Sequence, residues 1–169
     1  MKETQDQYVE RISGYVKGKN HFKVFQGTVK KLQSILEQGE RSRLLRQRQA
    51  DKWSAGEILA HLAESELVLG YRLRLVLARN GATVQAFDQN QWQANAGYLV
   101  KDVRESLALF RALRESNISL LKSITKKQWN AFGIHEERGK EDIARMVELY
   151  AGHDVNHLKQ IENLVKKRK

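Results

Sequence analysis

The sequence predicts an all-α protein built as a four-helix bundle. The 169 residues include no proline, and the glycines fall mostly between segments of helical periodicity. No segment shows the alternation of polar and apolar residues that indicates a strand. Four long amphipathic segments remain, and helices of this kind bury their apolar stripes against one another in a bundle.

Five segments have the apolar period of about 3.6 residues that is typical of a helix. They cover residues 5–15, 22–38, 54–79, 103–124 and 141–166. The first is short, and we expect an extra N-terminal helix that packs across the other four. Residues 87–92 and 125–130 are each expected to form a turn or two of helix.

The helix predicted at residues 54–79 has the clearest boundaries. Ser54 and Glu57 fit a capping box, in which each side chain bonds a free backbone N–H of the other. Asn80 and Gly81 mark its end. The apolar stripe contains Ile58, Leu62, Leu69, Leu73 and Val76 or Leu77, and the arginines expected to face solvent are Arg72, Arg74 and Arg79.

In the last helix, two histidines occupy the apolar stripe. His153 and His157 are four residues apart, so both side chains lie on one face and can bind a single ion. The pair is not a zincin motif, because Asp154 stands where that motif has glutamate. Hydrogen-bonded buried histidines, or an exposed pair, are the alternative interpretation.

A third histidine, His61, favours the metal interpretation. It lies roughly 10 Å into its helix, and His157 lies roughly 13 Å before the end of the last helix. Antiparallel helices would therefore bring the three rings to one depth. Three histidines with an open fourth position, available to water or a thiol, are typical of a catalytic metal site. Since the chain has no cysteine, a metal site must use His, Asp or Glu, and imidazole suits zinc, nickel or iron.

Three further residues are candidates for a catalytic role. Glu64 lies on the same flank as His61 and could act as a base or form an exposed salt bridge. Tyr150 precedes His153 on the same stripe and could donate a hydrogen bond. His135, expected in a loop before the last helix, could carry protons or be merely solvated.

Asp154 and Asn156 also flank the pair, but they point to other faces of the helix. They are expected to bind neighbouring helices.

The length fits one domain over residues 1–169, with residues 1–20 as an N-terminal extension and residues 166–169 as a disordered basic tail. The N-terminus lacks the apolar core of a signal peptide, and no window is long and apolar enough to span a membrane. We therefore expect a cytoplasmic protein.

The net charge of +10 raises an alternative function, binding of nucleic acid or another polyanion, with structural histidines. The basic groups are Arg41, Arg43, Arg46, Arg48 and the tail from Lys166 to Lys169. No nucleic-acid motif accompanies them, and no aromatic residues alternate with the basic run. This alternative ranks below metal binding, as does a metal that only braces the bundle.

Several motifs together resemble the DinB/YfiT-like superfamily. They are Lys52-Trp53-Ser54, His61-Leu62-Ala63-Glu64-Ser65-Glu66, Gly133-Ile134-His135 and the run from Ala151 to His157. The resemblance covers the chain from about Phe22 onward. It departs at Glu64, where the family more often has aspartate.

The resemblance implies a four-helix bundle with one divalent ion per chain, nickel or zinc, on His61, His153 and His157. It also implies a metal-dependent hydrolase, or an S-transferase that uses a low-molecular-weight thiol, acting on a small-molecule substrate. A homodimer is a further expectation from the family.

Overall fold

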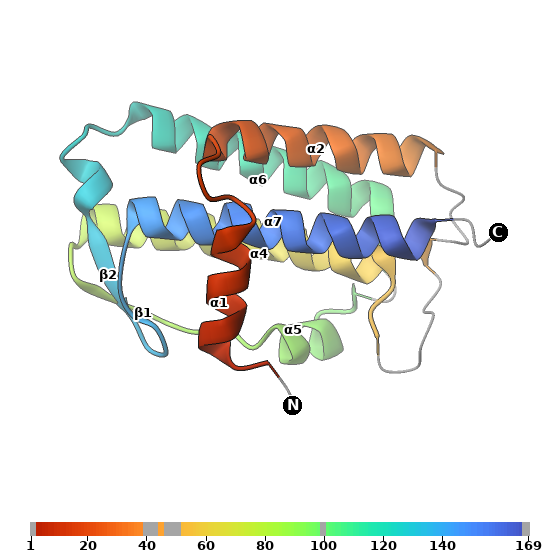
Figure 1. Ribbon diagram of the computed structural model, residues 1–169, viewed down its shortest axis with the longest axis horizontal. Helices are drawn as coiled ribbons and strands as arrows, with labels where there is room; N and C mark the ends of the chain where they lie inside the picture. Colours follow the sequence, from red (N-terminus) through yellow and green to blue (C-terminus); the bar gives the residue numbers. More distant parts are fainter. Residues whose placement is uncertain (1–2, 39–43, 46–51, 99–100, 167–169) are drawn as a thin grey trace.

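The computed structural model describes residues 3–38, 44–45, 52–98 and 101–166, and within them four long helices form a bundle. These are α2 (His21–Gln38), α4 (Ala55–Ala78), α6 (Val103–Ser123) and α7 (Ile143–Val165). Both α2 and α4 contact α6 and α7, so the four helices close around a shared interior (Figure 1). The predicted four-helix bundle is confirmed.

The helices α4 and α7 run in opposite directions along the bundle, as the histidine spacing requires (Figure 1). The start of α4 is fixed by the predicted capping box. The Ser54 hydroxyl accepts from the Glu57 backbone N–H at 3.2 Å, and the Ser54 backbone N–H donates to the Glu57 carboxylate at 2.8 Å. His61 is therefore held about two turns into α4.

The interior has two apolar clusters separated along the bundle axis. One contains Phe25, Leu69, Leu73, Leu121, Ile143 and Met146, and the other contains Leu32, Ile58, Leu62, Phe110, Leu158 and Ile161. Between them in α4, α6 and α7 lie buried polar residues. Arg114 bonds Asp154 at 2.6 Å and Glu66 at 2.8 Å, and all three side chains are almost completely buried.

A small sheet closes one end of the bundle, so the expectation of no strands was wrong. Its strands are β1 (Ala82–Val84), β2 (Phe132–His135) and β3 (Gly139–Asp142), with β1 parallel to β2 and β2 antiparallel to β3. Each is too short to show a period in the sequence. The strand β3 also takes the first residues expected in the last helix, which begins instead at Ile143, after the N-cap residue Asp142.

The short helices lie outside the bundle. The first, α1 (Gln5–Gly14), packs across α7, as predicted. The second, α5 (Gln89–Asn95), overlaps the stretch expected at residues 87–92 and continues beyond it. A 3-10 turn at Gln128–Asn130 lies within the stretch expected at residues 125–130. Of the basic groups considered for polyanion binding, Arg41, Arg43, Arg46, Arg48 and residues 167–169 lie outside the described residues. None of the described helices has the length and apolarity to cross a membrane.

Candidate metal centre

Three histidine rings from two helices converge in the middle of the bundle. His61 comes from α4, and His153 and His157 come from α7. One ring nitrogen of each lies within 4.8 Å of the others, and the Nε2 atoms of His61 and His153 are 3.0 Å apart. The convergence that the sequence predicted from helix depth is present.

All three rings are held in the neutral form. Burial, with a smaller contribution from the nearby His157, lowers the pKa of His61 to about 3. Burial lowers the pKa of His157 to about 4, although its hydrogen bond to Gln160 opposes the shift. The pKa of His153 is also well below its usual range, because of burial and its two histidine neighbours. Neutral imidazoles are the form that ligates a metal.

Hydrogen bonds among the described residues do not account for the burial of these rings. The Nδ1 atoms of His61 and His153 are buried and have no partner within the described part of the chain. His157 differs, since its Nδ1 lies 2.9 Å from the Gln160 side-chain oxygen, which leaves Nε2 for the centre. An unpaired buried polar atom is costly. The Nε2 atoms of His61 and His153 contact each other, and the Ser65 hydroxyl lies 3.5 Å from the His61 Nε2 atom, but these contacts leave both Nδ1 atoms unpaired among the described residues. Three nitrogen donors at one point fit a divalent ion.

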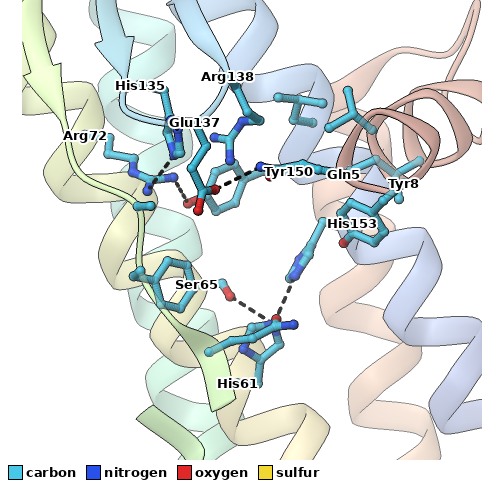
Figure 2. Close-up of a pocket in the computed structure, with 16 residues that line it drawn as sticks. Gln5, Tyr8, His61, Ser65, Arg72, His135, Glu137, Arg138, Tyr150 and His153 are labelled. Atoms are coloured by element: carbon cyan, nitrogen blue, oxygen red, sulfur yellow. Dashed lines mark hydrogen bonds between the residues drawn. The ribbon is translucent and has the colours of Figure 1, made fainter. Parts of the chain in front are cut away.

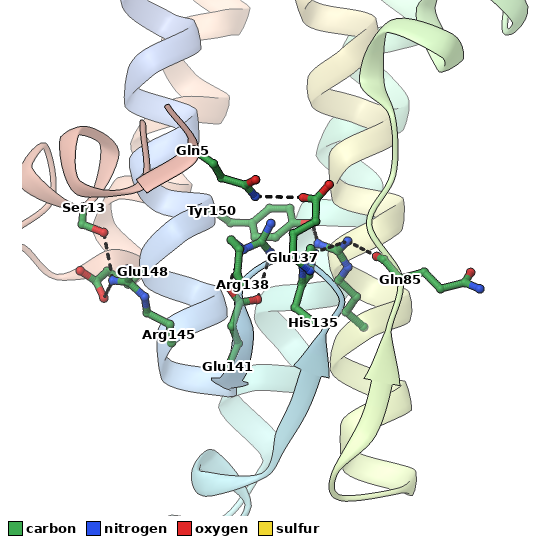
Figure 3. A network of polar contacts seen from close by, with 11 residues as sticks. Gln5, Ser13, Gln85, His135, Glu137, Arg138, Glu141, Arg145, Glu148 and Tyr150 are labelled. Carbon is green, nitrogen blue, oxygen red and sulfur yellow. Dashed lines mark hydrogen bonds and ion pairs between the residues drawn. The ribbon is translucent and has the colours of Figure 1, made fainter. Parts of the chain in front are cut away.

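A cavity of about 170 Å³ opens beside His61 and His153. Residues of α1, α4, α7, the segment after β1 and the β2–β3 hairpin line it (Figure 2). Across its mouth, Gln5 of α1 donates to Glu137 of the hairpin at 2.9 Å, while the neighbouring Arg138 bonds Glu141 (Figure 3). The cavity suits a small molecule, because one water needs only roughly 10–15 Å³.

The wall of the cavity opposite the histidines is polar. Arg72 of α4 donates to the Tyr150 hydroxyl oxygen at 3.3 Å and to the Gln85 carbonyl oxygen, and it lies 3.3 Å from the Nε2 atom of His135. Burial and the cations Arg138 and Arg72 lower the pKa of His135 to about 4. Burial raises the pKa of Tyr150. At neutral pH this wall therefore consists of one cationic side chain, Arg72, and two neutral ones, Tyr150 and His135.

The three predicted catalytic candidates have different positions. Tyr150 and His135 both line the cavity, although His135 ends strand β2 and is not in the expected loop. Glu64 is not among the lining residues, and it forms an ion pair with Lys101. The alternative considered for Glu64 was an exposed salt bridge, and this salt bridge is partly buried.

The two polar residues beside the pair bind neighbouring helices, as expected. Asp154 pairs with Arg114 of α6, and the Asn156 side-chain oxygen accepts from Arg11 of α1 at 2.7 Å.

Sequence reasoning missed two contributors to the cavity. Arg72 was expected in solvent but is 5% exposed, because its guanidinium reaches the ends of β1 and β2, which the sequence did not reveal. The helix α1 was expected only to pack across the others, yet Gln5, Tyr8 and Ile12 line the cavity. The only available signal was the amphipathic pattern of residues 5–15.

Comparisons with known proteins agree with this description. The sequence model of the DinB superfamily matches residues 25–161. Two Oceanobacillus iheyensis proteins, each named "Putative metal-dependent hydrolase", are 27% identical over 116 residues and 29% identical over 110 residues. These matches cover 69% and 65% of this chain, and they span 67% and 63% of the relatives' own length.

YfiT of Bacillus subtilis, which has the same descriptive name, is 26% identical over 114 residues, covering 66% of this chain and 64% of YfiT. A solved structure of YfiT is described as a probable metal-dependent hydrolase with an unusual four-helix bundle topology. It matches this structure with a TM-score of 0.79 at 21% identity, over 95% of this chain and 87% of that chain. The structural match supports the bundle fold.

Proposed function

This chain belongs to the DinB superfamily, and from that premise we propose that it is a metal-dependent hydrolase whose His61, His153 and His157 hold one divalent ion. The observation that carries the proposal is the convergence of three neutral imidazoles beside a cavity, with His61 and His157 buried and His153 partly buried. The names of the relatives, which contain the words metal-dependent hydrolase, support the same reaction class. Imidazole ligands favour zinc or nickel.

The protein's own groups prepare the site in three ways. The depressed histidine pKa values keep the rings neutral at neutral pH, so each ring has one unprotonated nitrogen available to the ion. Gln160 fixes the orientation of the His157 ring. Helix α1 and Phe87 form part of the wall of the cavity beside His61 and His153. A divalent ion held there would supply Lewis acidity and lower the pKa of a water molecule.

A thiol S-transferase is the second candidate, and the donor set is what favours it. None of the three donors carries charge, so the full charge of the ion would favour an anionic nucleophile, whether it came from water or from a low-molecular-weight thiol.

Metal analysis of tag-free protein tests the proposed site. We expect about one zinc or nickel ion per chain in the wild type, a near-complete loss in His153→Ala, and no loss in His21→Ala, because His21 begins α2 and lies outside the cluster. Circular dichroism would establish that the variants are folded. Fewer than about half an ion per wild-type chain would contradict the proposal.

In hydrolysis the product gains an oxygen atom from water, whereas in thiol transfer it gains the sulfur atom of the thiol. Metal-loaded protein is incubated with small esters, amides and alkyl halides in ¹⁸O-labelled water, with and without a low-molecular-weight thiol. Incorporation of ¹⁸O that depends on His153 identifies a hydrolase. A thioether or thioester product identifies the transferase and excludes hydrolysis as the principal reaction.

A further inference from the structure

The cavity contains a buried cation, Arg72, that forms no ion pair with a described carboxylate, although Glu137 also lines the cavity. Arg72 is 5% exposed, and its three contacts are a phenol oxygen, a backbone carbonyl oxygen and a neutral ring nitrogen. No described carboxylate lies within ion-pair distance of it. The acidic groups of the hairpin are engaged elsewhere, since Glu141 pairs with Arg138 and Glu137 accepts from Gln5.

A second buried arginine in the same bundle, Arg114, has the carboxylate partners that Arg72 lacks. Arg114 is 1% exposed and is paired with two carboxylates, Asp154 and Glu66. Buried charges are normally paired in this way. Arg72 has the same burial but, among the described residues, only neutral partners. Its guanidinium also has five N–H groups, of which two donate to described oxygen acceptors, those of Tyr150 and Gln85.

Two aromatic rings connect Arg72 with the histidine cluster. The Phe87 ring centre lies 6.3 Å from that of His61 and 6.0 Å from the Arg72 guanidinium carbon. The Tyr150 ring centre lies 6.1 Å from that of His153, and its hydroxyl oxygen contacts Arg72. The guanidinium of Arg72 and the rings of His61 and His153 therefore lie at opposite ends of one cavity (Figure 2).

We propose that Arg72 and Tyr150 bind the carboxylate of a small substrate and so direct its reactive end toward the three histidines. This inference rests on the proposed function, because the histidine cluster supplies the reacting end. Guanidinium is suited to a carboxylate by charge and by its planar set of donors. The Tyr150 oxygen accepts from Arg72, so its own O–H is available to donate to the same carboxylate.

A carboxylate fits this wall better than a phosphate does. Phosphates are typically bound by several cations or by a cluster of backbone N–H groups. In the described cavity lining, Arg72 is the one arginine without a carboxylate partner, because Arg138 is held by Glu141. The neutral state of His135 adds no second positive charge.

Binding of propionate, measured by titration calorimetry or ligand-observed NMR, tests the inference. Propionamide, which has the same shape without charge, and inorganic phosphate are measured in parallel. The variants are Arg72→Met, Arg72→Lys and, as a matched control that removes the same charge from the exposed end of α4, Arg79→Met. Each protein is measured both metal-loaded and after chelation, and the metal content of each is determined separately.

We expect propionate to bind the wild type and Arg79→Met equally, and to bind Arg72→Met about tenfold or more weakly, in both metal states. Arg72→Lys should bind with intermediate affinity, and propionamide should not bind measurably to the wild type. The metal content should be unchanged by Arg72→Met, so a failure of the metal site would be seen independently.

Equal binding of propionate and propionamide to the wild type would overturn the inference, and this comparison needs no variant to fold. Propionate binding that requires the ion and is insensitive to Arg72→Met would place the carboxylate on the metal and also overturn it. Tighter binding of phosphate than of propionate would overturn the choice of carboxylate.

Discussion

The three histidines differ in what their second ring nitrogen contacts. The Nδ1 of His157 has Gln160, whereas those of His61 and His153 have no partner among the described residues. A hydrogen bond at the second nitrogen fixes the tautomer and the orientation of a ligating ring. Gln160 is therefore the one side chain in the described structure that orients a ring of the cluster in this way.

Gln160→Ala should weaken metal affinity by about 10- to 100-fold, because the His157 ring loses the acceptor that orients it. Gln160→Glu keeps an acceptor at the same position and should retain most of the affinity. Competition with a chromogenic chelator measures both variants against the wild type. Equal affinities for the wild type and Gln160→Ala would show that the ring is oriented by its helix alone.

His135 gives the protein a pH dependence that can be isolated from that of the metal site. Its pKa is lowered from 6.5 to about 4 by burial and by Arg138 and Arg72. Between these values the unfolded chain takes up a proton that the folded protein does not. The contribution of His135 to the free energy of unfolding is therefore largest above pH 6.5, and it decreases as the pH falls from 6.5 toward 4.

His135→Gln removes this proton, so the free energy of unfolding should depend less steeply on pH. Between pH 6 and pH 5 the slope should decrease by about 1.4 kcal/mol per pH unit, which corresponds to one proton. Urea unfolding in the presence of a chelator measures the slope, since the other histidines then contribute equally to both proteins. Parallel curves for the two proteins would refute the assignment.

At the scale of elements, α1 is held against α7 by a close backbone contact. A Cβ atom at Gly152 would lie 2.2 Å from the Ile12 carbonyl oxygen, far closer than atoms can approach. Gly152 is next to His153, and α1 contributes Gln5 and Tyr8 to the cavity. The glycine therefore allows α1 to complete the cavity wall.

Gly152→Ala should destabilise the protein by about 1–3 kcal/mol, because the new methyl group pushes α1 away from α7. Gly27→Ala is the matched control in a helix, since a Cβ there meets nothing within 4 Å, and it should stabilise by about 0.5–1 kcal/mol. Thermal unfolding gives the stabilities, and hydrogen exchange over residues 5–14 should increase only in Gly152→Ala. Unchanged exchange in that variant would contradict this role for the contact.

The sequence predicted the elements that carry their own local signals. The Ser54 capping box located the start of α4, and the end expected for α6 was one residue beyond its last residue, Ser123. The strands β1 and β2 were missed because they pair residues about fifty positions apart, as in Ala82 with Gly133. The buried position of Arg72 was missed for the same reason, since its partners lie on elements that only the tertiary fold brings near. The histidine cluster could be predicted because two helices and their spacing define it.

At the scale of the whole molecule, a polar layer divides the apolar interior and joins three helices of the bundle. Arg114 of α6 bonds Glu66 of α4 and Asp154 of α7, and Asn117 adds a bond to Glu66 at 3.0 Å. The layer is next to the histidine cluster, because Asp154 follows His153 in α7. It therefore sets how α4 and α7 lie relative to one another at the depth where the histidines meet.

Arg114→Met should destabilise the protein by about 3–5 kcal/mol at pH 7, because two buried carboxylates lose the cation that neutralises them. Arg111→Met is the control on the same helix, where the pair with Glu115 is exposed, and it should change stability by less than about 1 kcal/mol. The charge mechanism makes a second prediction. Burial raises the pKa of Glu66, and Arg114 opposes this shift, so in the variant Glu66 would take up a proton more readily in the folded state than in the unfolded state. The loss of stability should therefore shrink as the pH falls from 7 to 5. Urea unfolding of both variants and the wild type across this pH range measures the loss of unfolding free energy. A loss for Arg114→Met that stayed constant with pH would show that it comes from packing and not from charge.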